Sequence, residues 1–327
     1  MPNVRFPTSG SMQYWPRKKA RKPYARVRYW AEVKECKPLG FAGYKVGMTH
    51  VLITDNRKES TTKDQEISIP VTILECPPIK VFSVRFYKKE GHEKKIFYEE
   101  VAANLDKGLK RKVRVPKKKS NSSIDNIKEF DEIKILVHTQ PRLIGIGKKR
   151  PEIFEMKIGG SKEEQINFAK NNLGKEINVS TVFNEGEQID VHSISKGKGY
   201  QGPVKRFGIG IRRHKSEKTK RGPGSLGGWK AQGHVMYRVP HAGQTGYHMR
   251  TEHNKWVIKI SDKINEINPK GGFIRYGEVK NSFILMKGSV AGSTKRMIIM
   301  SHPSRANKFI PSDPPQINYI SLDSKQG

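Results

Sequence analysis

The most basic segments of this chain are also the segments least able to form a packed core. Residues 1–50 contain 11 Lys and Arg against 2 acids, and residues 196–250 contain 13 against 1. Together they supply +21 of the formal net charge of +32. This excess goes beyond what solubility requires and indicates a polyanionic partner. Basic segments without a core of their own are usually held open by their ligand.

The first basic segment reads as an extended arm. Pro16 and Pro23 prevent a continuous helix, and Tyr24 and Trp30 alternate with cations. Such an arm suits RNA, because aromatic and guanidinium planes stack on bases while Lys and Arg meet phosphates. A nuclear-type address and a solvated tail are the alternatives. We predict RNA contacts at Arg17, Lys18, Lys19, Arg21, Lys22, Arg26 and Arg28.

The second basic segment, residues 196–254, reads as a long glycine-rich loop. Residues 196–250 hold 12 of the 30 glycines, and no acid occurs from Lys218 to Thr251. Glycine lets a backbone approach a ligand closely, and a long loop without a helical or strand period indicates a function. We predict RNA contacts at Lys196, Lys198, Tyr200, Lys205, Arg206, Arg212, Arg213, His214, Lys218, Lys220, Arg221, Trp229, Lys230, Arg238, His241, Gln244, His248 and Arg250.

Two tryptophans receive different predictions. Trp229 lies between Gly228 and Lys230, far from any apolar run, so we expect it at the tip of the loop, where it would stack on a nucleobase or wedge into RNA. Trp256 lies in an alternating segment typical of a strand, so we expect it in the core.

The remainder of the chain predicts a mainly β protein. Strands are expected within residues 38–55 and 69–89, at 134–138 and 188–195, around 256–260, and at 283–287 and 297–300. Strands near both ends of the chain with no helix between neighbours favour an antiparallel β-barrel. One helix is expected after Ser161, which forms a capping box with Glu164, and Gly174 ends it.

These patterns suggest a division of the chain into seven parts. They are a basic N-terminal arm (1–37), a first part of the barrel (38–89), an inserted α/β domain (90–176), a barrel strand region (177–195), the basic loop (196–254), the remainder of the barrel (255–300) and an extended C-terminal tail (301–327).

A glycine pattern raises the possibility of a dinucleotide site. Gly197 to Gly202 matches G-x-G-x-x-G after an expected strand, and Glu217 follows 20 residues beyond Gly197. A dinucleotide fold opens a helix at this point, whereas Pro203 follows here and Glu217 sits in a basic loop. We therefore expect no cofactor.

Other catalytic and metal patterns fail on spacing. The histidines at 234, 241, 248 and 253 include no helical i,i+4 pair, and the cations around them would repel a metal ion. Ser225 lacks the spacing of a nucleophile elbow, and residues 222–230 do not form a P-loop. We predict that the chain is not an enzyme and has no metal site and no small-molecule substrate.

Cysteine content and hydropathy bear on location. Cys36 and Cys76 are too few for a disulfide framework or a zinc site. The N-terminal region is basic and lacks an apolar run, and no later segment approaches the ~20 apolar residues of a membrane span. We expect a reduced, cytosolic protein with no membrane partner.

Three segments resemble a known family. Phe41 to His50, Lys196 to Arg206 and Ala242 to His248 are similar to segments of the universal ribosomal large-subunit protein three. The arm from Gly10 to Arg21 and the ending from Ser324 to Gly327 resemble its archaeal form. The resemblance covers essentially the whole chain.

This resemblance implies more than composition does. It implies a barrel of the reductase, isomerase and elongation-factor type with an inserted α/β domain. It also implies direct binding to 23S rRNA near its 3′ end, nucleation of large-subunit assembly, and a location on the cytoplasmic ribosome. The loop and arm would reach toward the peptidyl-transferase centre, and ribosomal proteins fourteen and twenty-four-e would be neighbours.

Two positions in the loop relate directly to the family pattern. Trp229 matches the tryptophan at the loop tip of archaeal and eukaryotic members. Lys220 stands where eukaryotic relatives carry a methylated histidine, so that modification is not carried over. Two rival functions remain: a nucleotide-dependent oxidoreductase that uses the Gly197 loop, and a general nucleic-acid or chromatin protein that prefers duplex DNA.

Overall fold

The computed structural model describes Ser11, residues 14–114, Ile124, Ile127 and residues 129–216, 218–228 and 233–323. The chain forms two compact units. The smaller unit combines residues 1–23 with residues 194–250, and the larger combines residues 24–193 with residues 251–327. Two segments that are far apart in sequence are therefore folded together in the smaller unit.

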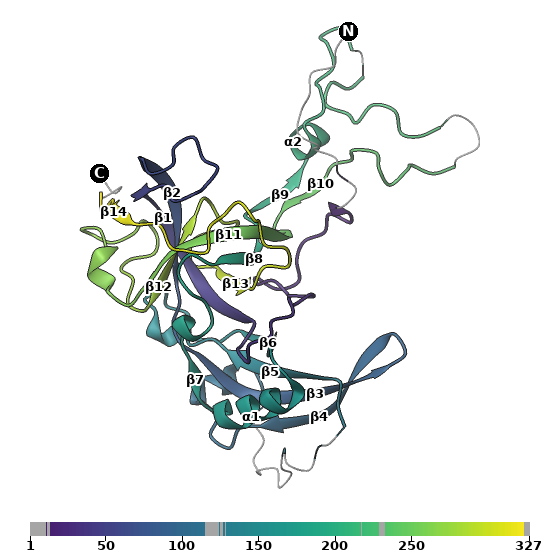
Figure 1. Cartoon of the computed structure of the whole chain (residues 1–327). Coiled ribbons are helices and arrows are strands. Elements are labelled where there is room, and N and C mark those ends of the chain that lie inside the picture. Colours follow the sequence, from purple (N-terminus) through teal and green to yellow (C-terminus); the bar gives the residue numbers. More distant parts are fainter. Residues whose placement is uncertain are drawn as a thin grey trace. The chain divides into compact units, whose positions relative to one another are not determined.

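A seven-stranded antiparallel sheet forms one part of the larger unit (Figure 1). Its strands are β1 (Gly40–Thr54), β2 (Glu66–Glu75), β8 (Gln188–Ile194), β11 (Met249–Ser261), β12 (Phe283–Lys287), β13 (Met297–Ser301) and β14 (Ile317–Ile320). They follow the order β13-β8-β11-β12-β2-β1-β14, and β1 also pairs with β13. This architecture confirms the predicted mainly β, antiparallel class.

A five-stranded sheet forms the other part. Its strands are β3 (Ile79–Glu90), β4 (Glu93–Val101), β5 (Glu132–His138), β6 (Ile153–Lys157) and β7 (Glu176–Ile177), in the order β4-β3-β5-β6 with β7 paired to β3. The sequence analysis placed residues 69–89 in the barrel, whereas β3 belongs to this second sheet. Pro77 and Pro78 explain the change of sheet, since neither has the N–H that a ladder requires.

Helix α1 (Lys162–Asn172) begins as predicted. The Ser161 side chain accepts a hydrogen bond from the Glu164 amide, and the Glu164 carboxylate accepts one from the Ser161 amide at 2.9 Å. Gly174 follows the helix with φ +82°, a conformation that suits glycine. The buried positions of the helix are Ala169 and Gln165, and Gln165 is tolerated because its Nε2 donates to the Gly160 carbonyl at 2.9 Å.

Short helical turns complete the described elements. The larger unit has 3₁₀ helices η2 (Lys107–Arg111), η4 (Pro141–Leu143), η5 (Val179–Thr181) and η6 (Ile264–Glu266). The smaller unit has β9 (Gly197–Gln201), α2 (Pro203–Phe207) and β10 (Gly243–Gly246). No helix within the described residues has both the length and the apolar character needed to cross a membrane.

The main hydrophobic core includes Trp256, as predicted. Trp256 is 2% exposed, and its Nε1 donates to the Gly186 carbonyl at 3.0 Å. Tyr24 and Trp30, which we expected to face RNA with the arm, are also in this core and are only 7% and 8% exposed. Burial of their large apolar surface outweighs the pattern of neighbouring cations.

The C-terminal segment was predicted to be an extended tail. Strand β14 instead pairs with β1, with Val51 opposite Ile320 and Leu52 opposite Tyr319. Strand β1 can accept this partner because it is 15 residues long, and its first part is already paired with β13. Residues 324–327 lie outside the described part of the chain.

The contact between Trp30 and β1 can be tested with Gly40→Ala. A Cβ at Gly40 would lie 2.6 Å from the Trp30 ring and 2.8 Å from the Met300 carbonyl oxygen. We expect the free energy of unfolding, measured by denaturant titration, to fall by about 1–3 kcal/mol because of overpacking.

Gly47→Ala is the matched control on the same strand. Its Cβ would meet only the Phe273 ring at 3.4 Å, so a change within about 1 kcal/mol is expected. Equal stability of the two variants would show that the Trp30 ring does not pack on Gly40.

Candidate nucleic-acid interface

The smaller unit joins the basic arm and the basic loop that the sequence analysis singled out. Residues 1–23 and 194–250 contain 19 Lys and Arg and one acid, Glu217. The cations of this unit therefore have almost no carboxylate of their own to pair with. Such a charge balance is typical of a surface that meets phosphates.

An antiparallel ribbon of β9 and β10 forms part of this unit (Figure 1). Residues 196–254 were predicted to have no strand period, so the ribbon and the start of β11 at Met249 correct that interpretation. Gly246 explains the miss: its φ is +71°, and a Cβ there would lie 2.1 Å from the Lys196 carbonyl oxygen. A glycine that allows two strands to approach each other closely cannot be told, from the sequence alone, from a glycine in a loop.

A helix does follow Gly202, contrary to our expectation. Helix α2 begins at Pro203, whose fixed φ suits the first helical position, and ends at Gly208 with φ 67°. It is only five residues long, and the strand before it pairs antiparallel with β10. The strand and helix of a dinucleotide-binding unit, with its parallel sheet, are therefore not formed at this glycine pattern.

Arg206 of α2 connects the arm to the loop. Its Nε donates to the Gln244 carbonyl at 3.1 Å, and its two terminal nitrogens donate to the carbonyls of His241 at 2.8 Å and Arg17 at 3.4 Å. A guanidinium has five N–H groups, so these three contacts occupy most of its capacity. Arg206, which we predicted as an RNA contact, therefore acts first as a positioning residue within the unit.

Aromatic rings surround this connection. The Trp15 ring stacks on Phe207 and meets Tyr237 edge-on, with 6.0 Å between ring centroids in each pair. The Arg17 guanidinium lies 4.7 Å from the Phe207 centroid, within the range of a cation–π contact. The sequence analysis missed Trp15 and Phe207 as organising residues, because an aromatic beside a cation reads equally well as an RNA contact.

The half-buried arginines are close enough to influence one another. Burial and the charges of Arg206 and Arg250 lower the pKa of Arg17. Burial also lowers the pKa of Arg206 and of Arg250, whose guanidinium lies 4.6 Å from the centroid of Tyr14. Three mutually repelling cations in one place raise the free energy of the unit, and a bound anion would relieve this cost.

His248 ties a further part of the arm to the loop. Its Nδ1 lies 3.0 Å from the Lys18 carbonyl oxygen, and the Ala20 amide donates to the Tyr247 carbonyl at 2.9 Å. Burial lowers the pKa of His248, and the charges of Arg250 and the other two arginines lower it further, while the Lys18 carbonyl opposes this. A neutral imidazole that donates to a carbonyl fits these contacts, so His248 holds the arm in place.

The other predicted contact residues divide by exposure. Gln244 is half-buried in β10. The exposed predicted contacts of the smaller unit are Lys18, Lys19, Arg21, Lys22, Lys196, Lys198, Tyr200, Lys205, Arg212, Arg213, His214, Lys218, Lys220, Arg221, Arg238 and His241. Arg26 and Arg28 are exposed but belong to the larger unit. Trp229 and Lys230 lie outside the described residues. Tyr200 is 76% exposed, so its ring is available for stacking.

The described residues include potential metal-binding side chains and both cysteines of the chain. They contain no group of three or more His, Cys, Asp or Glu side chains that could hold a metal ion. Cys36 and Cys76 are free, and burial raises the pKa of both thiols.

The role of Arg206 can be tested with Arg206→Lys, which keeps the charge. A lysine cannot hold three carbonyls in the geometry of a guanidinium. We expect hydrogen exchange at the Ala20 amide to accelerate by about tenfold or more, since the arm loses charge-assisted contacts.

Lys205→Arg, at an exposed position of the same helix, is the control and should leave exchange unchanged. Unaltered protection of Ala20 in Arg206→Lys would mean that the arm is held by other contacts.

The chain is similar in sequence to one family of known proteins over its whole length. A sequence model of the family "Ribosomal protein L3" matches residues 1–327. Similar curated proteins, each named large ribosomal subunit protein uL3, come from Methanobrevibacter smithii at 45% identity and Methanocaldococcus jannaschii at 42%. These matches cover 98% and 99% of this chain and the same shares of the relatives, and a protein of the same name from Methanothrix thermoacetophila is 42% identical over 100% of both. The chain therefore belongs to the ribosomal protein L3 family.

Proposed function

We propose that this chain is a structural constituent of the large ribosomal subunit, in the cytoplasm, that binds 23S rRNA directly. The observation that carries the proposal is the smaller unit, in which arm and loop fold together with 19 Lys and Arg against one acid. Membership in the ribosomal protein L3 family supports it. The relatives' printed name gives the large subunit as the assembly.

We assign different roles to the buried and exposed cations of this unit. Arg206 and His248 bind backbone carbonyls and so shape the unit. The exposed Lys and Arg side chains are our choice for contacts with phosphates, which fix position without reading sequence. Tyr200, with its exposed ring on β9, is our choice for a stacking contact with a base.

Finer parts of the function rest on the family resemblance. We propose that the binding site lies near the 3′ end of 23S rRNA, that binding nucleates subunit assembly, and that the loop extends toward the peptidyl-transferase centre with Trp229 at its tip. Ribosomal proteins fourteen and twenty-four-e are the proposed protein neighbours. We do not propose a catalytic role.

The fold type is also a proposal. Strand β1 pairs with both β2 and β13. The pairings therefore lead from β13 through β8, β11, β12, β2 and β1 back to β13. We propose that this ring of six strands is a barrel of the reductase, isomerase and elongation-factor type. Strands β3 to β7 with α1 would form the inserted α/β domain, and the seven-part division of the chain remains a prediction.

Site-specific RNA binding can be measured with three ligands of equal length: an rRNA fragment from the 3′ region, an unrelated RNA and duplex DNA. We expect the rRNA fragment to be preferred at both low and high salt. Affinity should fall with a slope of about −0.7 to −0.9 in log–log form for each phosphate contact.

Three results would contradict the proposal. Equal binding of all three ligands that disappears at high salt would identify a general polycation, and preference for the duplex DNA would favour a chromatin-type protein. Saturable binding of reduced dinucleotide cofactor in a fluorescence titration would favour an oxidoreductase.

The loop tip can be tested with Trp229→Ala in purified subunits. We expect translation to be impaired while the affinity for rRNA falls only slightly, because one stacked base contributes only about 1–3 kcal/mol among many contacts. Normal translation by the variant subunits would exclude a role of Trp229 at the functional centre.

A further inference from the structure

The larger unit has a cavity that none of the predicted RNA-contact residues line. It has a volume of about 490 Å³, and its wall includes Arg57, Asn254, Trp256, Lys287 and Phe309. These residues come from the segment after β1, from β11 and β12, and from the segment after β13. The volume lies within the usual range for a site that holds a small organic group.

Lys287 places a half-buried positive charge at this cavity, whose wall also includes one carboxylate, the exposed Glu59. Its ammonium lies 5.6 Å from the centroid of Trp256, and among the described residues no carboxylate lies within ion-pair distance of it. Burial and the charge of Arg57 lower the pKa of Lys287, and Asp55 opposes this to a lesser degree. A half-buried cation beside a second cation is a site where an anion would be stabilised.

Arg57 is held in position by Asp55, whose carboxylate offsets its charge. Its Nε and one terminal nitrogen bind the two oxygens of Asp55 at 2.8 and 2.7 Å. Asp55 also accepts hydrogen bonds from the Arg57 amide and the Thr62 hydroxyl. This carboxylate is thus already committed, and it does not neutralise Lys287 as well.

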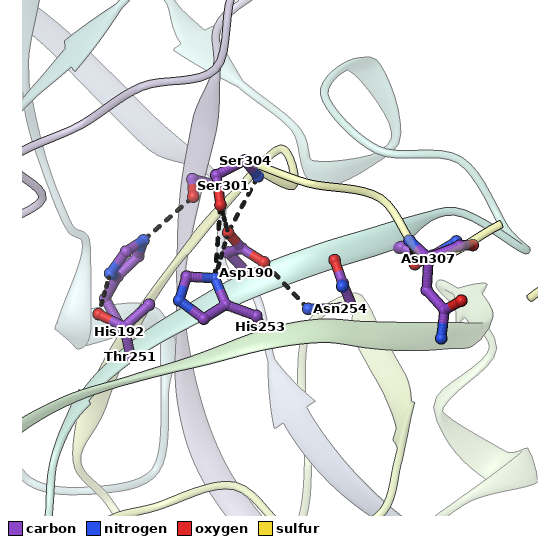
Figure 2. A network of polar contacts seen from close by, with 9 residues as sticks. Asp190, His192, Thr251, His253, Asn254, Ser301, Ser304 and Asn307 are labelled. Atoms are coloured by element: carbon purple, nitrogen blue, oxygen red, sulfur yellow. Dashed lines mark hydrogen bonds and ion pairs between the residues drawn. The ribbon is translucent and has the colours of Figure 1, made fainter.

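Asn254 contributes a side chain with an unbonded acceptor to the wall. Its φ of +55° lies in the left-handed region, which Asn adopts more readily than most residues, and its buried Oδ1 has no hydrogen-bond partner among the described residues. The buried Asp190 holds the backbone there by accepting a hydrogen bond from the Asn254 backbone N–H at 2.9 Å (Figure 2). An unpaired buried polar atom costs free energy and is uncommon in a folded protein.

Asp190 itself is fixed from the other side. It accepts hydrogen bonds from the amide and hydroxyl of Ser304, each at 3.0 Å, and from His253 Nδ1 at 2.8 Å (Figure 2). The position of Asn254 is therefore set by a network that joins β8, β11 and the segment after β13.

Phe309 presents an exposed ring on a well-held backbone. Its side chain is 65% exposed, while its amide donates to the Asn307 side chain at 3.0 Å. The backbone amide and carbonyl of Asn307 are each bonded to the Gln188 side chain at 2.8 Å. An exposed ring on an ordered backbone offers a surface on which a flat ligand can stack.

We propose that this cavity binds one nucleotide, with its base on Phe309 and its phosphate at Lys287 and Arg57. Two cations and a stacking ring are groups that a single unpaired nucleotide uses. The site lies outside the arm and loop, so it goes beyond the proposed interface. The nucleotide would come from a single-stranded RNA segment or from the free pool.

The experiment measures binding of AMP, ribose 5-phosphate and a single-stranded tetranucleotide to the full-length protein. We expect AMP to bind more tightly than ribose 5-phosphate, because only AMP has a base to stack. Lys287→Met, which keeps an apolar stem over Trp256, should weaken binding of AMP by about tenfold, and Phe309→Ala should weaken it by about fivefold or more.

Lys308→Met removes the same charge at an exposed neighbour that does not line the cavity, and serves as the control. If Lys287→Met and Phe309→Ala weaken binding of both AMP and the tetranucleotide, the site accepts a nucleotide from either source. If they weaken binding of the tetranucleotide alone, the nucleotide comes from RNA. If they weaken binding of AMP and the tetranucleotide does not compete with AMP, the nucleotide comes from the free pool.

The proposal is overturned if Lys287→Met and Phe309→Ala bind both nucleotide ligands as Lys308→Met does. It is also overturned if AMP and ribose 5-phosphate bind equally and Phe309→Ala has no effect, since the cavity would then hold only an anion. Arg206→Lys alters only the smaller unit. If this variant loses its preference for the rRNA fragment but still binds AMP, the nucleotide cavity and the proposed rRNA interface are separate sites.

Discussion

The Arg206 guanidinium holds together the parts of the smaller unit through backbone carbonyls of Arg17, His241 and Gln244. A carboxylate could have bound the guanidinium more strongly, but it would also have cancelled a positive charge. Carbonyl dipoles orient the cation and leave its charge in place. An interface for a polyanion needs a defined shape and undiminished charge, and this mode of connection provides both. The arm can therefore be ordered against the loop without loss of attraction for phosphates.

The two units treat their cations differently. In the larger unit, several cations form ion pairs with acids: Arg57 binds Asp55 at 2.7 Å, and Arg85 binds Glu99 at 2.8 Å. These pairs contribute little individually when exposed, but they keep like charges from accumulating around a folded core. The smaller unit has one acid, so its cations contact aromatic rings and backbone carbonyls instead. One unit is thus built around a hydrophobic core, and the other is built to remain positive.

Much of this organisation could be predicted, for reasons that depend on the local sequence. The α1 capping box and the core position of Trp256 follow from short patterns with few alternative readings. The burial of Tyr24 and Trp30 could not be predicted, because aromatic residues among cations fit both an RNA arm and a core edge. The β9–β10 ribbon was missed because Gly246 serves a close backbone approach. Arg206 was named as a contact, but its role in positioning depends on carbonyls up to 189 residues away.

Lys287 combines a positive charge with partial burial. It lies half-buried beside Arg57, and its ammonium lies 5.6 Å from the centroid of the Trp256 ring. Nearby Asn254 keeps a buried side-chain oxygen that has no hydrogen-bond partner among the described residues. Both features cost folding free energy, and they occur on the wall of one cavity next to an exposed, anchored Phe309. Costs that coincide in space in this way are explained most simply by a ligand that removes them together.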